Sequence, residues 1–306
     1  MSIIEKALNK NSPLDAEKKV HQENSNDADG NSIEQSELNK EYLSQQSADY
    51  DSSSQVQNSA FKNAAKTSRK IEINLEHLED QGIIVPSKER SILNEEYRRI
   101  KQPLINNIKG KSAHPIARAN LLQVTSALPA EGKTFTAVNL AMAISQEFDY
   151  TVLLVDADLL RPSLNDVFGI EERAGLSEYL SGDVDALSDV LLTTNIPKLT
   201  LLPAGKKHHL TSELFSSSLM DNLFNELSER YSDRIIIIDS PPVLSTNEAN
   251  ILSRKVGQIV FVIEQNKTTQ AQVKEALSQF DDNSVLGIVM NKSRIGNSSG
   301  YYGYYY

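Results

Sequence analysis

Apolar and polar positions in residues 121–291 fall into two alternating patterns, short apolar runs and longer stretches with helical spacing. The apolar runs, which we interpret as strands, begin at residue 121 and then span residues 151–155, 199–203, 234–239, 258–263 and 286–291. The fourth run shows no polar alternation, as expected for a strand whose two faces are both covered. Helical spacing is clearest at about 219–231 and 269–280. This order predicts an α/β fold with a mostly parallel, doubly wound sheet.

A different pattern precedes this region. Residues 9–70 are rich in Ser, Asn, Gln, Asp, Glu and Lys and poor in large apolar residues, which predicts a disordered extension. Residues 2–8 have the spacing of a short amphipathic helix, which is marginal by itself. Residues 71–78 are ambiguous between strand and helix. We therefore expect three parts: a largely disordered extension over 1–84, a folded domain over 85–295 and a flexible tail over 296–306.

Helical periodicity returns at residues 91–101, where Asn94 or Ser91 can serve as the N-cap. Glu95, Arg98 and Lys101 recur every three residues, so they lie near one another on the outer face of this helix. From the spacing alone, this row is a solvated charged face.

The stretch 121–134 has the order of a phosphate-binding loop, which is a short strand, a tight loop and a helix start. The loop ends in Gly132, Lys133 and Thr134, at a helix start whose N–H groups favour an anion. Lys133 can reach the outer phosphates of a nucleotide, and the Thr134 hydroxyl can bind magnesium. Ala127 replaces the first glycine of the usual pattern, so a chance match at an ordinary helix start is the alternative. The fold that this loop predicts is a P-loop NTPase.

Two alanines depart from the usual loop pattern. Ala127 and Ala130 stand where glycine is common, and alanine fits such positions where the backbone angle φ is negative. We expect the loop and one later asparagine to contact ATP. The expected ATP-binding residues are Pro129, Ala130, Glu131, Gly132, Lys133, Thr134, Phe135 and Asn291.

Three aspartates follow predicted strands. Asp156 and Asp158 come after the second strand of the series, and Asp239 ends the isoleucine-rich fourth one. Carboxyl ends of parallel strands meet at one edge of a sheet, where ligands bind, and Mg²⁺ prefers oxygen ligands. A single aspartate in such a place is more often a helix cap or a turn residue, but three beside a phosphate loop indicate a Mg-nucleotide site. We expect Thr134, Asp156 and Asp239 to hold the magnesium ion.

Tyrosines gather at the C-terminus, where five of the 11 lie in the last six residues. They are Tyr301, Tyr302, Tyr304, Tyr305 and Tyr306. The cluster has three interpretations: a low-complexity end, a stacking surface for bases or sugars, or the substrate of the nucleotide site. A tyrosine hydroxyl has a pKa of about 10 and needs a positioned base to attack phosphorus. Asp158 is the candidate base, and Lys133 is the candidate for polarising the phosphates.

The amino-acid composition argues against several classes of function. The chain has no cysteine, so it has no disulfide, thiol nucleophile or Cys-ligated metal. Its net charge of −10 argues against a broad electrostatic contact with nucleic acid. No run approaches the roughly 18 apolar residues of a membrane-spanning helix.

Taken together, these motifs resemble those of the bacterial tyrosine autokinases (BY-kinases) of exopolysaccharide synthesis, which have a P-loop ATPase fold. Residues 126–134 resemble their Walker A motif, 155–162 their A′ motif, and 237–242 their Walker B motif. The tyrosine tail resembles their autophosphorylated cluster. The row Glu95, Arg98 and Lys101 is similar to their oligomerisation motif, with lysine in place of the last arginine. Residues 1–8 and 96–103 further resemble the subgroup found at exosortase-linked polysaccharide loci.

The resemblance implies a tyrosine kinase that uses ATP and Mg²⁺ and phosphorylates its own tail within a homo-oligomeric ring. It also implies a cytoplasmic protein, peripheral to the inner membrane, whose partner is the cytosolic segment of a membrane polysaccharide copolymerase. Cycles of phosphorylation would regulate polymer length or export.

Two other functions fit a phosphate loop. A positioning or partitioning ATPase of the same superfamily carries an extra lysine early in the loop, where this chain has Leu128. A nucleotide-binding adaptor would use the tail only to dock a partner.

Overall fold

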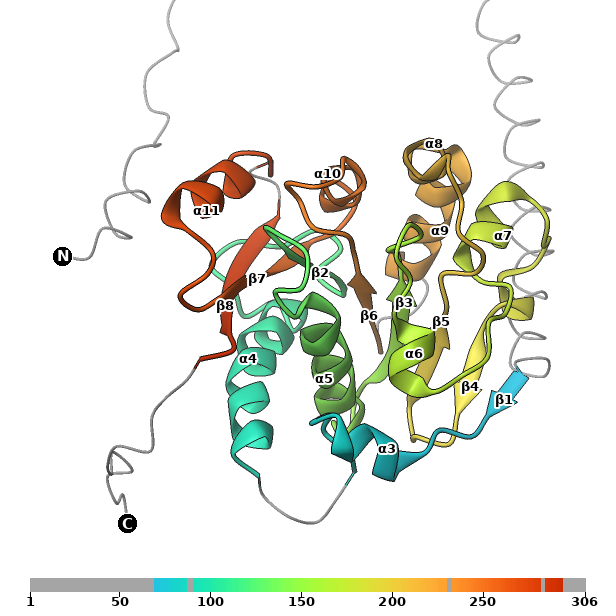
Figure 1. The fold of residues 1–306 in the computed structure, drawn as a ribbon, viewed down its shortest axis with the longest axis horizontal. Helices are drawn as coiled ribbons and strands as arrows, with labels where there is room; N and C mark the ends of the chain where they lie inside the picture. The colour runs from blue at the N-terminus through green and yellow to red at the C-terminus, as the bar shows by residue number, and fades with distance from the viewer. Residues whose placement is uncertain (1–68, 87–90, 230–232, 282–283, 294–306) are drawn as a thin grey trace, which may run out of the picture. The chain divides into compact units, whose positions relative to one another are not determined.

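The computed structural model describes residues 69–86, 91–229, 233–281 and 284–293 (Figure 1). Within these ranges the chain forms an eight-stranded sheet with the order β1-β4-β5-β3-β6-β2-β7-β8. The strands are β1 (Arg69–Ile71), β2 (Leu121–Ser126), β3 (Thr151–Asp156), β4 (Leu192–Thr194), β5 (Leu199–Leu202), β6 (Arg234–Asp239), β7 (Gln258–Glu264) and β8 (Val285–Asn291). All neighbouring strands are parallel except β4 and β5. The predicted α/β fold with a mostly parallel sheet is confirmed.

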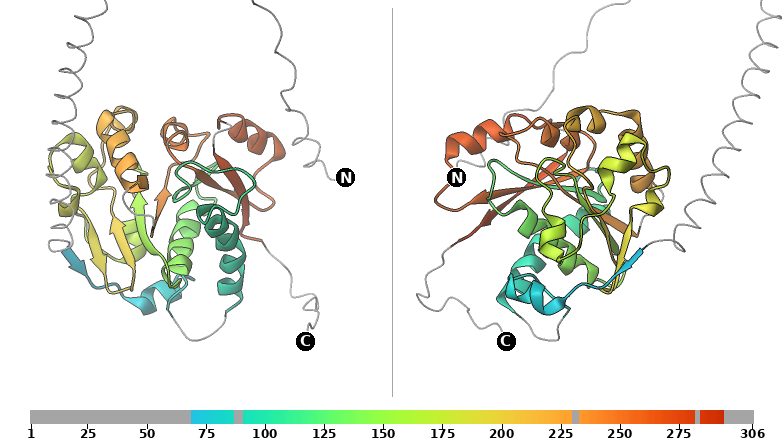
Figure 2. Two further views of the ribbon diagram at one scale, coloured as in Figure 1. Left: turned by 180° about the vertical axis from the view of Figure 1, so that it is seen from behind. Right: turned by 45° about the vertical axis from the view of Figure 1, so that its right-hand side comes forward.

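Helices cover both faces of the sheet (Figures 1 and 2). One face carries α3 (Leu75–Asp80), α4 (Ile92–Ile108), α5 (Lys133–Ser145) and α6 (Leu164–Phe168). The other carries α7 (Leu176–Ser181), α8 (Thr211–Phe215), α9 (Ser218–Glu229), α10 (Glu248–Ser253) and α11 (Gln270–Leu277), with a 3₁₀ turn at Leu187–Asp189. In the part of the chain that the structure describes, no helix has both the length and the apolar character needed to cross a bilayer.

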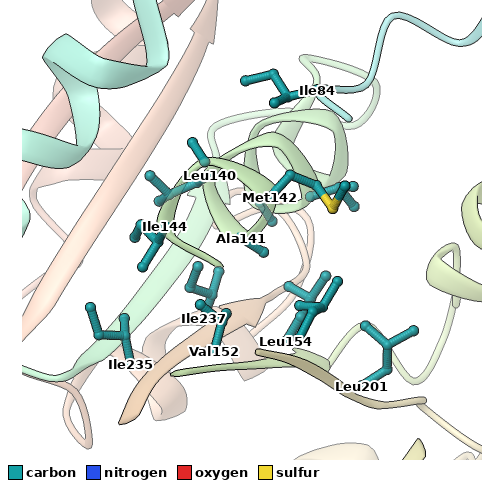
Figure 3. Close-up of a cluster of buried hydrophobic side chains, with 14 of the residues drawn as sticks. Ile84, Leu140, Ala141, Met142, Ile144, Val152, Leu154, Leu201, Ile235 and Ile237 are labelled. Carbon is teal, nitrogen blue, oxygen red and sulfur yellow. The ribbon is translucent and has the colours of Figure 1, made fainter. Parts of the chain in front are cut away.

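Alternate residues of the central strands enter two separate cores. Val152 and Leu154 of β3 pack with the α5 side, whereas Leu153 packs with the α9 side. Figure 3 shows Val152, Leu154 and Ile237 between the strands and α5. The two-sided burial explains why the interiors of β3 and β6 have no polar alternation. Helix α5 is buried over most of its length because α4 and the segment after α3, at Ile84, pack against its other side.

The folded part begins earlier than the expected boundary at residue 85. Strand β1 pairs with β4, and Ile71, Leu78 and Ile84 are buried in the core on the α5 side. Asn74 caps α3 by accepting hydrogen bonds from two backbone N–H groups of its first turn. The ambiguous pattern at 71–78 is therefore a strand end followed by a helix. The proposed helix at 2–8, the rest of the extension up to residue 68 and the tail at 296–306 lie outside the described residues.

Helix α4 is longer than the pattern at 91–101 predicts. Of the two candidate caps, Ser91 is the one that the structure shows, since its hydroxyl accepts a hydrogen bond from the Asn94 N–H at 3.1 Å. The helix then continues through Pro103 to Ile108, although proline removes one helical hydrogen bond. Leu104 and Ile105 are buried beyond the proline, and this burial favours continuing the helix.

Candidate active site

The phosphate loop joins the buried strand β2 to α5 at the carboxyl edge of the sheet. Gly132, just before α5, has φ 95° and ψ 26°, which lies in the left-handed region. A Cβ atom at this position would lie 2.0 Å from the side-chain nitrogen of Asn291. Glycine is therefore required at 132 both for its backbone angle and for the space beside β8.

The two loop alanines behave differently. Ala127 is fully buried and is not among the positive-φ residues of the described ranges. Ala130 has a φ of 65°, so the negative angle that would suit alanine is not found at this position. A left-handed non-glycine residue costs roughly 1–2 kcal/mol, so surrounding contacts must hold the loop in this shape.

Lys133 is paired with Asp158. The Lys133 Nζ donates to Asp158 Oδ2 at 2.9 Å, and the two side chains are only 11% and 5% exposed. Burial acts to lower the pKa of Lys133, but the charges of Asp239, Asp158 and Asp156 outweigh it, so the pKa is raised. Lys133 thus remains a cation in a cluster of carboxylates.

Asp239 ends β6 beside the corresponding Asp156 of β3. It is fully buried, and within the described residues neither of its carboxylate oxygens has a hydrogen-bond partner. Burial raises its pKa, although the Lys133 charge and the nearby Thr134 hydroxyl act in the opposite direction. A buried acceptor without a partner is rare and costly. This carboxylate is therefore well suited to a cation that the chain itself does not supply.

Asp156 is bound by the backbone of the turn that follows β3. One carboxylate oxygen accepts from the Asp158 N–H at 3.1 Å, and the other accepts from the N–H groups of Ser163 and Leu164 at 3.0 Å. Burial and the charge of Asp239 raise the pKa of Asp156 to about 7. Asp156 therefore shapes the turn and the start of α6, and it retains lone pairs for a further ligand.

Among the described residues, no three His, Asp or Glu side chains form a ready-made metal site. The expected set of Thr134, Asp156 and Asp239 contains only two carboxylates. This fits Mg²⁺, which is commonly bound by one or two carboxylates together with water and nucleotide phosphates. The partnerless oxygens of Asp239 are the specific feature that matches such an ion.

Two contacts of the site were not predicted from the sequence. The Thr134 hydroxyl lies 3.0 Å from that of Ser163, which directly precedes α6, a position where serine is a helix-start signal. Thr268, before α11, donates to the carboxyl group of Glu131. The helix start at 269 was expected, and the capping box of Thr269 and Gln272 marks it, but nothing in the sequence indicates the contact of Thr268.

The other expected ATP-binding residues lie on or beside the loop. Pro129 and Ala130 are exposed, and Phe135 is partly buried against the core on the α5 side. Asn291, at the end of β8, donates to the backbone oxygen of Glu131 at 2.9 Å. The five tail tyrosines lie outside the described residues.

The charged row of α4 divides into two parts. Glu95 and Arg98 form an exposed ion pair at 3.7 Å, with side chains 45% and 67% exposed. Lys101 is only 13% exposed and points to α5, where it donates to the backbone oxygen of Ala143 and pairs with Glu147, both at 2.7 Å. Lys101 therefore has a partner inside its own chain.

Comparison with known proteins gives consistent matches. A family model described as an AAA domain matches residues 130–284. Tyrosine-protein kinase YwqD of Bacillus subtilis is 32% identical over 228 residues, which cover 73% of this chain and 92% of the relative. Tyrosine-protein kinase ptk of Acinetobacter johnsonii is 35% identical over 187 residues, which cover 60% of this chain and 25% of that relative. The solved kinase domain of the Escherichia coli tyrosine kinase ETK matches with a TM-score of 0.56 and 25% identity, over 74% of this chain and 99% of that domain.

The region matched by the family model contains Lys133, Asp158 and Asp239, the charged centre of the candidate site. The match to YwqD extends over nearly that whole protein, and the fold agrees with that of a solved tyrosine kinase domain. On these grounds the chain belongs to the bacterial tyrosine-protein kinases.

Proposed function

We propose that this chain is an ATP-dependent tyrosine autokinase that phosphorylates the cluster Tyr301, Tyr302, Tyr304, Tyr305 and Tyr306. The observation that carries the proposal is the buried centre beside the phosphate loop. There Lys133 is held by Asp158, and Asp239 has no partner for either oxygen. A P-loop lysine next to an unpaired carboxylate suits a nucleotide with its metal ion.

The loop residues would hold the phosphates of ATP. Backbone N–H groups at the start of α5 point toward an anion site, and Lys133 has three N–H donors, of which one is directed to Asp158. Thr134 and Asp239, with Asp156 directly or through water, would hold Mg²⁺. When bound, the metal supplies neutralisation of charge on the phosphate oxygens.

Asp158 would act as the base. Its Oδ2 is paired with Lys133, and its Oδ1 accepts from the Arg161 N–H at 3.0 Å, so the carboxylate is fixed in place. As the phosphates draw on Lys133, Oδ2 becomes available to accept the proton of a tyrosine hydroxyl. The phenolic oxygen then bonds to the γ-phosphorus, and the bond from that phosphorus to the ADP oxygen breaks.

Assembly and regulation rest on the resemblance to BY-kinases of exopolysaccharide synthesis and to their exosortase-linked subgroup. We place the chain in the cytoplasm, at the inner membrane through the cytosolic segment of a polysaccharide copolymerase. In the proposed ring each tail enters a neighbouring site, and phosphates on the tail add repulsion that loosens the ring. Glu95 and Arg98, which are exposed, are the residues available for such an interface.

The test is incubation of the purified chain with Mg-ATP, followed by intact and peptide mass spectrometry. The expected result is phosphate confined to residues 301–306 in the wild type and none in Lys133→Met. Phosphotyrosine in the purified K133M protein would contradict the proposal. Hydrolysis of ATP without any phosphotyrosine would favour a positioning ATPase instead.

A further inference from the structure

We infer that Glu131 is a positioning residue, which with Thr268 holds the phosphate loop in the shape that receives a nucleotide. The inference rests on the proposed nucleotide binding at this loop. In this inference the connection between β7 and α11, which contains Thr268 and has no part in the proposed phosphoryl transfer, supports the phosphate loop.

Glu131 is a buried acidic side chain inside the loop itself, with 0% of its surface exposed. One carboxyl oxygen accepts from the Leu128 N–H at 2.7 Å, which closes the loop upon itself. The other accepts from the Thr268 hydroxyl. The Thr268 hydroxyl also accepts a hydrogen bond from the Glu264 N–H at 3.0 Å. Because it both donates and accepts a hydrogen bond, its orientation is fixed. Glu131 therefore connects the loop to the end of β7.

A second set of contacts binds the loop from β8. Asn291 donates to the backbone oxygen of Glu131 at 2.9 Å, and Lys292 donates to the backbone oxygen of Ala130 at 2.6 Å. Lys292 also pairs with Glu264 at 3.1 Å, the residue whose N–H group binds Thr268. The loop backbone and the Glu131 side chain are thus attached to two adjacent strand ends.

The loop needs these contacts because of its alanines. Ala130 stands in the left-handed region, where a residue with a Cβ atom is disfavoured. The two contacts of the Glu131 carboxyl group fasten the segment on either side of it, at Leu128 and at Glu131 itself. Without them the strained segment would relax to other backbone angles, and the N–H groups of the loop would no longer converge on one anion.

The test is isothermal titration of Mg-ADP into the full chain and five variants, one of which is a control. Each hydrogen bond lost is worth a factor of about 2–10 in Kd. We expect Glu131→Leu to weaken binding about tenfold or more and Thr268→Val to weaken it about threefold. Glu131→Gln keeps an acceptor for the Leu128 N–H and a polar contact for Thr268, so it should stay within about threefold of wild type. In the E131L background, T268V should add less than about twofold, because the contact is already gone.

Thr269→Val is the matched control, since it removes the N-cap hydroxyl of α11 one residue away and leaves the contact with Glu131 intact. It should lower the unfolding temperature and leave the Kd unchanged. A purely structural role for Glu131 would lower the unfolding temperature of E131L while its folded fraction keeps the wild-type Kd, and this would overturn the inference. If E131L does not fold, T268V with a wild-type Kd overturns it equally. If the wild type itself does not bind Mg-ADP, the proposed function fails and the inference with it.

Discussion

Asp239 is a fully buried carboxyl group whose oxygens have no partner in the described part of the chain. Its neighbours are the corresponding Asp156 and the paired Lys133 and Asp158. Such a group destabilises the nucleotide-free protein, because burial and a like charge both disfavour the ionised form. Sites that hold a metal nucleotide commonly retain this kind of cost, since function depends on it.

Asp239→Asn should therefore stabilise the nucleotide-free chain. Removal of a buried carboxylate whose oxygens have no hydrogen-bond partner is expected to raise the free energy of unfolding by about 1–3 kcal/mol. The same variant should lose the added stability that Mg-ATP gives the wild type. Thermal unfolding with and without Mg-ATP measures both effects. A variant that is less stable than wild type in the absence of nucleotide would contradict this account of Asp239.

The acidic cluster also gives stability a pH dependence. The pKa of Asp156 is raised to about 7 by burial and by Asp239, while an unfolded aspartate titrates near 3.8. Between these values the folded chain keeps a proton that the unfolded chain releases, so the free energy of unfolding falls as pH rises through this window. The fall should be smaller in D239N, which lacks one of the two causes. Urea unfolding of the wild type and D239N from pH 5 to pH 8 measures how steeply the free energy of unfolding falls with pH. An equally steep fall in the two proteins would contradict the role given to Asp239.

Helix α4 shows how one element serves two purposes. Its outer face carries the exposed pair of Glu95 and Arg98, whereas Lys101 binds the last turn of α5 through the backbone oxygen of Ala143. A cation at a helix C-terminus is favourable, and here it stabilises the helix that starts at the phosphate loop. The lysine that departs from the family's oligomerisation motif thus has a contact within its own chain.

Lys101→Met keeps the apolar stem and removes the charge. We expect it to lower the free energy of unfolding by about 1–2 kcal/mol, from the lost contacts with Ala143 and Glu147. Arg98→Met on the same helix should stay within about 0.5 kcal/mol of wild type, because its ion pair is exposed. Denaturant unfolding compares the two, and sedimentation of the R98M protein reports on the proposed ring. Equal free energies of unfolding for K101M and R98M would show that the contacts of Lys101 with Ala143 and Glu147 do not stabilise the fold.

The long strands and helices were predictable, and the short ones were not. Uninterrupted apolar runs identify β3, β6 and β7, because both faces of a central strand are buried. Strand β2 contains Gln123 and Thr125 and is identified by the phosphate loop that follows it. Strands β1 and β4 have three residues each and exist because they pair with each other, which is a contact across more than a hundred residues. Helices of five or six residues, such as α6 and α8, are too short for periodicity to be detected.

The candidate site likewise has features that the sequence predicts and features that it does not. Strand order brings Asp156, Asp239 and the phosphate loop to one edge, and this could be expected from the sequence. The left-handed angle of Ala130 and the contact of Thr268 with Glu131 depend on how separate loops meet. Spacing along the chain carries no information about either.

At the scale of the whole molecule, the chain combines a bacterial tyrosine-kinase fold with a C-terminal segment that contains five tyrosines. The fold and the charged centre belong to the described residues, and the proposed acceptor tyrosines belong to the part beyond residue 293. The central claim is therefore that the site around Lys133 and Asp239 acts on the tail of another copy.

The most direct measurement separates the site from the acceptor. The K133M chain, which keeps its tail, is mixed with a chain that lacks residues 301–306 but keeps an intact site, and the intact mass of each is recorded after incubation with Mg-ATP. The account predicts phosphate on the K133M chain in the mixture only, confined to its last six residues. Phosphate on K133M incubated alone, or a mixture without phosphate under conditions where the wild type is modified, would contradict it.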